Sequence, residues 1–225
     1  MGYRLRKDVI PFKLKLKEFD EALLFSVQRN QSRRLSIAML TFTIMGNGGL
    51  IWAILSGFLI FNPSTSRYGL YMIIALLLCA LCNNVIFKTL VDRDRPCDVY
   101  KNVPLLIKRP FGSSFPSGHT ATSFACAVTL IHMDVRLGLI ALFLAFIIAF
   151  SRLYLFVHYP TDIIFGILSG AAVGVIAIQI VRLFLYFVPI SYFALHYKAN
   201  KQGTPLRKGS FFCFATFDLC CLCIA

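Results

Sequence analysis

The chain has 225 residues, of which 58% are hydrophobic, a formal net charge of +13 and a mean hydropathy of +0.73. Soluble domains of this length are closer to half apolar, so the composition predicts one compact membrane-embedded domain rather than a soluble enzyme. The basic surplus suits anionic lipids or a phosphorylated substrate. Nucleic acid is not an expected partner, because too little of the chain is polar enough to build a docking face.

The N-terminal segment, residues 1–34, is basic and polar. Within it, the stretch from Phe19 to Val27 places apolar residues at helical spacing. This pattern predicts an amphipathic helix that lies at the membrane interface without crossing it.

Residues 35–190 contain five apolar stretches, and we assign them to a transmembrane domain. A helix needs about 20 residues to cross the hydrocarbon core, and backbone polar groups in lipid must be satisfied within each span. The stretches are Leu35 to Phe61, Tyr68 to Phe87, Ala121 to Met133, Leu137 to Phe156 and Ile163 to Ile190. The third is long enough only if its helix starts near Ser117. The predicted fold class is therefore all-α, an integral-membrane bundle of about five transmembrane helices.

Glycines in the last stretch recur every four residues, at Gly166, Gly170 and Gly174. This spacing puts them on one helix face, where small residues let a neighbouring helix approach closely. We expect this face to pack against another span.

The remaining segment, residues 191–225, is basic and then rich in Cys and Phe. Four cysteines gather near its end, namely Cys213, Cys220, Cys221 and Cys223. Palmitoylation near the membrane is one interpretation of this tail, and a weakly ordered end without a role is the other. The CxxC pair Cys79 and Cys82 has no further Cys or His pair to complete a zinc site, so no metal site is predicted.

Three polar clusters interrupt the apolar background, at residues 88–96, 114–119 and 151–162. The first follows the second span, the second begins the third span, and the last joins the fourth span to the fifth. Since the third and fourth spans form an out-and-back pair, all three clusters lie on one face of the membrane. The topology predicts that they form one pocket.

The cationic residues of these clusters suit a phosphate ester. Lys88, Arg95 and Arg152 offer positive charge and many hydrogen-bond donors. Ser117 and Gly118 lie where a helix begins, and its free backbone N–H groups hold anions. Taken singly, a Lys or Arg here could equally extend to the lipid headgroups, but the joint arrangement favours substrate-phosphate binding.

Two histidines and one carboxylate complete the predicted pocket. Asp162 lies four residues after His158 and could accept from one imidazole nitrogen, leaving the other free to attack phosphorus. His119 is then available to protonate the departing oxygen. Each histidine alone is more often structural, so the hypothesis depends on their convergence.

These residues resemble the tripartite signature of the type 2 phosphatidic acid phosphatase superfamily, KxxxxxxRP, PSGH and SRxxxxxHxxxD. The chain matches it at Lys88, Arg95, Pro96, Pro116 to His119, Ser151, Arg152, His158 and Asp162. The resemblance implies that His158 forms a phosphohistidine, that Asp162 supports it and that His119 is the acid. It also implies that no metal or other cofactor is required.

The resemblance implies a lipid phosphate phosphatase acting on undecaprenyl diphosphate, phosphatidylglycerol phosphate or phosphatidate. The same family contains glucose-6-phosphatases and vanadate-dependent haloperoxidases, but five apolar spans argue against the latter. The alternative from another class is a transporter or flippase that binds an anionic lipid in the same pocket without hydrolysis. No feature of the sequence specifies an oligomeric state.

The side of the membrane that carries the pocket is a point of conflict. Five spans put the N-terminal segment, with nine Lys or Arg between Arg4 and Arg34, on the same face as the pocket. The positive-inside rule then makes that face cytoplasmic. The resemblance implies the opposite, an extracytoplasmic site in the plasma (cytoplasmic) membrane, and this is the orientation we expect.

Overall fold

The computed structural model describes residues 10–62 and 64–201, and the side chains of residues 14–62, 64–83 and 86–187. Within these ranges every regular element is helical, so the predicted fold class is confirmed. In chain order the elements are α1 (Ile10–Arg29), α2 (Arg33–Met45), the 3-10 turn η1 (Asn47–Gly49), α3 (Leu50–Phe61), α4 (Ser66–Cys79), the π-helix η2 (Ala80–Phe87), α5 (Lys88–Leu90), α6 (Pro96–Val99), α7 (Gly118–Met133), α8 (Val135–Tyr154) and α9 (Pro160–Lys201).

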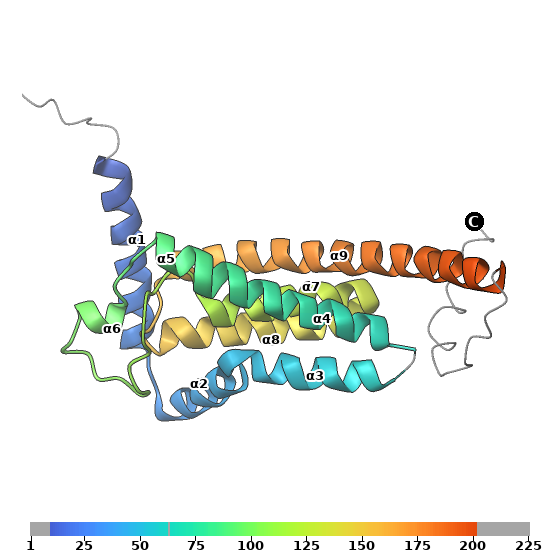
Figure 1. The fold of residues 1–225 in the computed structure, drawn as a ribbon. Coiled ribbons are helices and arrows are strands. Elements are labelled where there is room, and N and C mark those ends of the chain that lie inside the picture. The colour runs from blue at the N-terminus through green and yellow to red at the C-terminus, as the bar shows by residue number, and fades with distance from the viewer. Residues whose placement is uncertain (1–9, 63, 202–225) are drawn as a thin grey trace, which may run out of the picture.

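The long helices form a bundle around α7. Figure 1 shows α3, α4, α7, α8 and α9 running side by side along one direction, and α7 packs against α4, α8 and α9. The polar side chains of α7, including Ser123 and Thr129, are buried among these neighbours. Ser123 accepts a hydrogen bond from the indole of buried Trp52 at 2.9 Å. α7 is therefore a helix that faces protein on most sides.

The described residues contain three candidate membrane spans, or four if α2 and α3 together form one, against the five that were predicted. Three uninterrupted stretches are long and apolar enough to cross a bilayer, namely Ser66–Leu90, Val135–Tyr154 and Pro160–Phe187. The pair α2 and α3 meets the same test when its two helices are taken together. The fifth helix, α7, has 16 residues, fewer than the roughly 20 that a lipid-exposed helix needs. Its enclosure by other helices makes the shorter length sufficient.

The first predicted span, Leu35 to Phe61, is not one straight helix. α2 and α3 are bent by 45° relative to each other, with η1 between them. Gly48 and Gly49 have φ values of 59° and 73°, in the left-handed region that glycine tolerates and other residues rarely adopt. The sequence interpretation missed this break because hydropathy stays high across it.

The glycine face of α9 packs closely on α7, as predicted. A methyl group at Gly170 would lie 2.3 Å from the Ala121 carbonyl oxygen, and one at Gly174 would lie 2.7 Å from the Ala125 carbonyl oxygen. A real Cβ atom does not approach a carbonyl oxygen this closely, so neither position could hold a larger residue unless the two helices moved apart. The small residues therefore set the distance between these two helices.

The N-terminal helix is longer than predicted, since α1 covers Ile10–Arg29 rather than Phe19 to Val27. It stands roughly perpendicular to the bundle at one end (Figure 1), which is the orientation of a helix lying along a membrane surface. Phe19 and Leu23 are exposed on it, whereas Leu24 is fully buried against the bundle. At the other end of the chain α9 continues past Ile190, and the cysteine-rich tail lies outside the described residues.

Candidate active site

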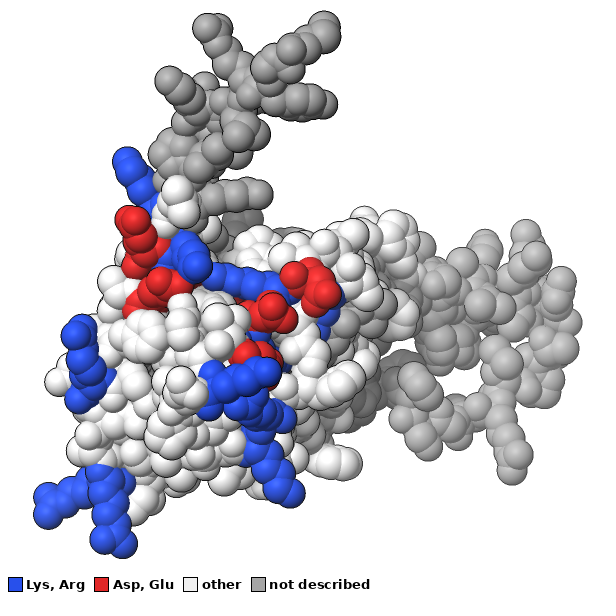
Figure 2. Space-filling view, turned by 90° about the vertical axis from the view of Figure 1, so that its left-hand side faces the viewer, with Lys and Arg blue, Asp and Glu red and all other residues white. Residues whose placement is uncertain are grey.

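The three polar clusters meet at the end of the bundle where α1 and α6 lie. Backbone hydrogen bonds join them directly: the Ser114 N–H donates to the Arg93 carbonyl at 2.7 Å, and the Ser117 N–H donates to the Asp162 carbonyl at 3.2 Å. Figure 2 looks onto this end and shows acidic and basic side chains close together near its middle. The three clusters, far apart in the sequence, are therefore joined at one end of the bundle.

Arg95 is a buried cation fixed beside an imidazole. Its guanidinium donates to the carbonyl oxygens of Gly112, Ser113 and Val157 at 2.9, 3.1 and 3.1 Å. One of its terminal nitrogens also lies 3.3 Å from Nε2 of His158. Because these carbonyls hold the side chain in place, its positive charge is directed at the histidine.

The protonation state of His158 follows from this contact. A guanidinium can only donate, so Nε2 accepts from Arg95 and the neutral ring carries its hydrogen on Nδ1. Nδ1 faces Oδ2 of Asp162 at 3.7 Å, slightly beyond hydrogen-bond distance. Burial lowers the pKa of His158 to about 4, and the Asp162 carboxylate opposes this shift only in part. The ring is therefore neutral at pH 7, with its Nε2 lone pair toward the cations.

Asp162 is held by several donors. Its Oδ2 accepts from the Ser114 hydroxyl at 2.5 Å and from the Tyr159 N–H at 2.9 Å, while its Oδ1 accepts from Arg93 at 2.6 Å. The carboxylate is completely buried. Its position next to His158 is therefore determined by neighbours on three segments of the chain.

Arg152 and Lys88 add charge to the same site. Arg152 is buried; one terminal nitrogen donates to the Thr43 hydroxyl of α2, and its Nε has no partner among the described residues. Lys88 is half-buried and lies within electrostatic range of Arg95 and Arg152. None of these three cations forms a salt bridge with a carboxylate in the described part of the chain. An uncompensated cluster of this kind is suited to bind a multiply charged anion.

The second cluster supplies the start of α7. Its first residue is Gly118, preceded by Ser117, whose hydroxyl bonds to Thr120 at 2.8 Å instead of capping the helix. The first N–H groups of a helix have no intrahelical partner and attract anions. His119 follows, and the charges of Arg152, Arg95 and Lys88 and the ring of His158 lie within electrostatic range of its imidazole.

The structure thus gathers all eight residues that the sequence singled out, namely Lys88, Arg95, Ser117, Gly118, His119, Arg152, His158 and Asp162. It adds three contacts that sequence reasoning missed: Ser114 on Asp162, Thr43 on Arg152, and Arg93 on Asp162. Thr43 carried no recognisable signal, because a threonine inside an apolar stretch is usually a packing residue. Among the described residues, no group of three or more His, Cys, Asp or Glu gathers that could hold a metal ion.

The fold and the site define an integral-membrane helical protein with a cluster of buried cations at one end of its bundle. The model of the PAP2 superfamily matches residues 67–186, more than half of the chain, and this range contains all three polar clusters. The chain belongs to the PAP2 superfamily.

Two relatives are similar to parts of the chain. The undecaprenyl-diphosphatase of Sulfolobus acidocaldarius is 27% identical over 58% of this chain and 63% of its own length. The bacitracin transport permease protein BcrC of Bacillus licheniformis is 31% identical over 45% of this chain and 49% of its own length. The match therefore spans less than two thirds of either relative.

A solved structure extends the comparison. The transmembrane PAP2-type phosphatidylglycerolphosphate phosphatase from Bacillus subtilis superimposes with a TM-score of 0.57 and 25% sequence identity. The superposition covers 78% of this chain and 92% of that one. The helical bundle is therefore shared over most of its length.

Proposed function

We propose that this chain is a membrane phosphatase that hydrolyses a lipid phosphate or diphosphate through a phosphohistidine on His158. One observation carries the proposal: the buried, neutral imidazole of His158 directs the lone pair of its Nε2 at the Arg95 guanidinium, and its Nδ1 faces the fixed carboxylate of Asp162. A nucleophile with a lone pair, a partner that stabilises its positive form and a phosphate-binding cluster are the parts that phosphoryl transfer requires.

In the first step, Arg95 transfers its N–H from Nε2 of His158 to a phosphoryl oxygen of the bound substrate, and the freed lone pair of Nε2 attacks phosphorus. The N–P bond forms as the bond from phosphorus to the leaving oxygen breaks, and positive charge develops on the imidazole. Asp162, accepting from Nδ1 after a small movement from 3.7 Å, stabilises this charge. Protonated His119 gives its proton to the leaving oxygen, so an alcohol departs neutral and a lipid monophosphate departs with one negative charge fewer.

In the second step, water attacks the phosphohistidine. Neutral His119 takes a proton from the water, the N–P bond breaks, and inorganic phosphate and free His158 are regenerated. Throughout, Arg95, Arg152 and Lys88 lie where charge spreads over the phosphoryl oxygens. We propose that these cations make a metal ion unnecessary, so activity is expected to persist in a chelator such as EDTA.

The substrate class follows from the position of the site and from the relatives. The site lies at the end of a transmembrane bundle, next to a helix oriented like a membrane-surface helix, where a lipid headgroup would be found. The named relatives include an undecaprenyl-diphosphatase and a phosphatidylglycerolphosphate phosphatase, both of which act on phosphates attached to lipids. We therefore propose an isoprenoid or glycerolipid phosphate as substrate.

A transporter is the second candidate, because one relative is named a transport permease. A carrier would use the same cations to bind an anionic lipid and would leave its phosphate attached. Phosphate release by purified protein in detergent separates the two functions, since a carrier releases none.

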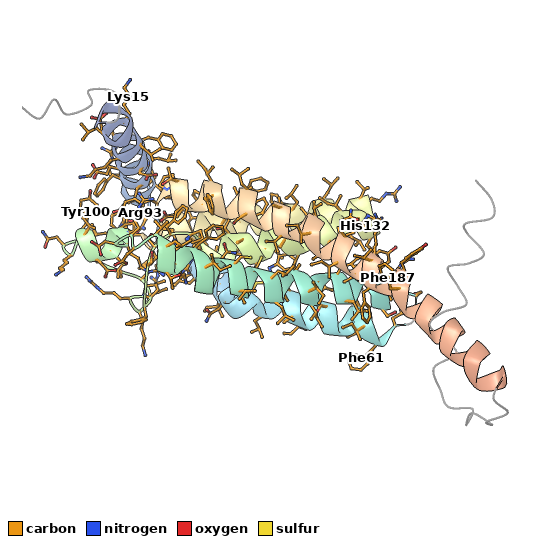
Figure 3. All side chains as sticks on the ribbon, turned by 45° about the horizontal axis from the view of Figure 1, so that its top comes forward. Lys15, Phe61, Arg93, Tyr100, His132 and Phe187 are labelled. Carbon is orange, nitrogen blue, oxygen red and sulfur yellow. The ribbon has the colours of Figure 1, made fainter. Side chains whose placement is uncertain are left out.

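The test is a phosphate-release panel with undecaprenyl diphosphate, phosphatidylglycerol phosphate, phosphatidate and a soluble sugar phosphate. We expect release from at least one lipid, inhibition by vanadate, and a loss of at least about 10³-fold in His158→Ala, because the nucleophile is removed. The matched control is His132→Ala. His132 pairs with Arg182 at the opposite end of the bundle (Figure 3), so this variant should retain activity. Full activity in His158→Ala would refute the assignment of the nucleophile.

A further inference from the structure

Arg93 links two buried carboxylates. One terminal nitrogen donates to Oδ1 of Asp162 at 2.6 Å and to the Thr161 hydroxyl at 2.7 Å, and the other donates to Oδ2 of Asp20 at 2.6 Å. The guanidinium also lies over the ring of Tyr159, 4.0 Å from its centre. Its plane is therefore fixed by a carboxylate at each end and by an aromatic ring on one face.

Asp20 belongs to α1, outside the bundle and outside the three clusters. Figure 3 shows Arg93 at the place where α1 meets the bundle. The Asp20 side chain is 1% exposed, although α1 is largely a surface helix. Burying an unpaired carboxylate costs several kcal/mol, so a buried Asp on such a helix requires specific partners.

Those partners are all next to the proposed catalytic carboxylate. Besides Arg93, Asp20 accepts from the Thr161 N–H at 3.0 Å and from the Thr161 hydroxyl at 2.7 Å. Thr161 immediately precedes Asp162 at the start of α9. Asp20 therefore holds both the backbone and the cation that set the position of Asp162.

We infer that Asp20 is a positioning residue for phosphoryl transfer, acting through Arg93 and Thr161 on Asp162 and, through Asp162, on His158. The inference rests on the proposed function. With Oδ1 of Asp162 held by Arg93, its Oδ2 stays directed at Nδ1 of the imidazole. Without Asp20, Arg93 loses one of its two carboxylate anchors, so its hold on Oδ1 of Asp162 weakens and the carboxylate is oriented only by Ser114 and Tyr159 at Oδ2.

The consequence is that α1 forms part of the active site. A helix oriented along the membrane surface contributes, by a single buried carboxylate, to the geometry of the nucleophile. Docking of α1 on the bundle thereby becomes a condition for full turnover. The competing explanation is that Asp20 only anchors α1, in which case its loss would lower thermal stability and leave the kinetics of the folded protein unchanged.

The test compares Asp20→Asn with Glu18→Gln, each assayed below its own melting temperature. Glu18 is an exposed acid on the same helix, so its variant removes the same charge without touching the network. We expect Asp20→Asn to lower kcat by about 10- to 100-fold with KM changed by less than about twofold, since the loss is of orientation and not of binding. Glu18→Gln should have the same kcat and KM as the parent protein.

A second variant keeps the inference testable if Asp20→Asn does not fold. Arg93→Lys retains the positive charge, but a single ammonium cannot bridge both carboxylates in the same way, so the same selective loss of kcat is expected. The double variant Asp20→Asn, Arg93→Lys should lose no more than the worse single variant, because both act through one contact chain.

Three outcomes would overturn the inference: an unchanged kcat in folded Asp20→Asn, a loss confined to KM, or losses that multiply in the double variant. His158→Ala is run in parallel. If it loses turnover while Asp20→Asn does not, the positioning role is wrong and the proposed function stands. If it keeps turnover, the proposed function itself fails.

Discussion

At the scale of single residues, the site is dominated by cations that lack a counter-charge. Arg95 and Arg152 are 4% and 5% exposed, and burying charge is costly unless it is paired. Arg95 offsets part of this cost with three backbone carbonyls, and Arg152 with the Thr43 hydroxyl. A bound phosphate would supply the missing negative charge, so the proposed binding of phosphate would offset the rest of this cost.

The buried neutral state of His158 predicts a pH dependence of stability. An unfolded histidine has a pKa near 6.5, whereas burial lowers the pKa of His158 to about 4. Between these values only the unfolded chain binds the proton, so stability is fully present above pH 6.5 and declines as the pH falls toward 4. At pH 5 this amounts to about 2 kcal/mol.

Thermal melts of purified protein at pH 7.5 and pH 5 measure this effect. The parent protein should lose clearly more stability on acidification than His158→Gln, whose side chain does not titrate. Equal losses in the two proteins would show that His158 is not held neutral by the fold.

At the scale of elements, the site depends on how closely α7 approaches α9. α7 begins with the residues proposed to hold phosphate and to donate a proton, and α9 begins beside Asp162. The glycine face of α9 sets the distance between the two helices. The bend at η1 has a related role, since a methyl group at Gly46 would lie 3.2 Å from the ring of His119.

Substituting Gly170 tests this dependence. A methyl group there would meet the Ala121 carbonyl oxygen at 2.3 Å, so Gly170→Ala should push the two helices apart, cost about 1–3 kcal/mol and lower kcat. The control is Gly57→Ala on α3, because a methyl group added at Gly57 would meet no neighbouring atom within 4 Å. That variant should be neutral or slightly stabilising, because alanine favours helix. Equal melting temperatures and rates for the two variants would contradict the packing argument.

At the scale of the whole molecule, α1 lies on the same face as the site. The basic residues of α1 lie on this face, and by the positive-inside rule they favour a cytoplasmic position for it. The opposite end carries basic residues of its own, including Arg136 and Arg182. Because basic residues lie at both ends of the bundle, the positive-inside rule discriminates less between the two orientations. We propose that the site faces the extracytoplasmic side.

Cysteine labelling in intact cells measures the orientation. In a background with the four C-terminal cysteines replaced by serine, Lys108→Cys lies on the exposed loop of the site face and Arg136→Cys at the opposite end. A membrane-impermeant maleimide should label the first and not the second. The reverse pattern would place the site in the cytoplasm, in agreement with the positive-inside rule.

The amino-acid sequence was sufficient to predict the fold class and to name the residues of the candidate site, whereas it predicted five spans where three or four candidates are found. Hydropathy along a chain reports directly which segments enter lipid, and helices are the form that satisfies their backbones. The order of the spans then requires the three polar clusters to share one face. Their spacing matched a known signature, so Lys88, His119, His158 and the others could be named in advance.

The bend in the first span and the contacts of Thr43, Ser114, Arg93 and Asp20 became visible in the folded structure alone. Each of these contacts joins residues many positions apart, and neither periodicity nor composition encodes such a pairing. Asp20 is the clearest case: on a helix that is mostly exposed, a carboxylate is expected to face water. Its burial follows from the docking of α1 on the bundle, a long-range packing event that no local pattern along the chain reports.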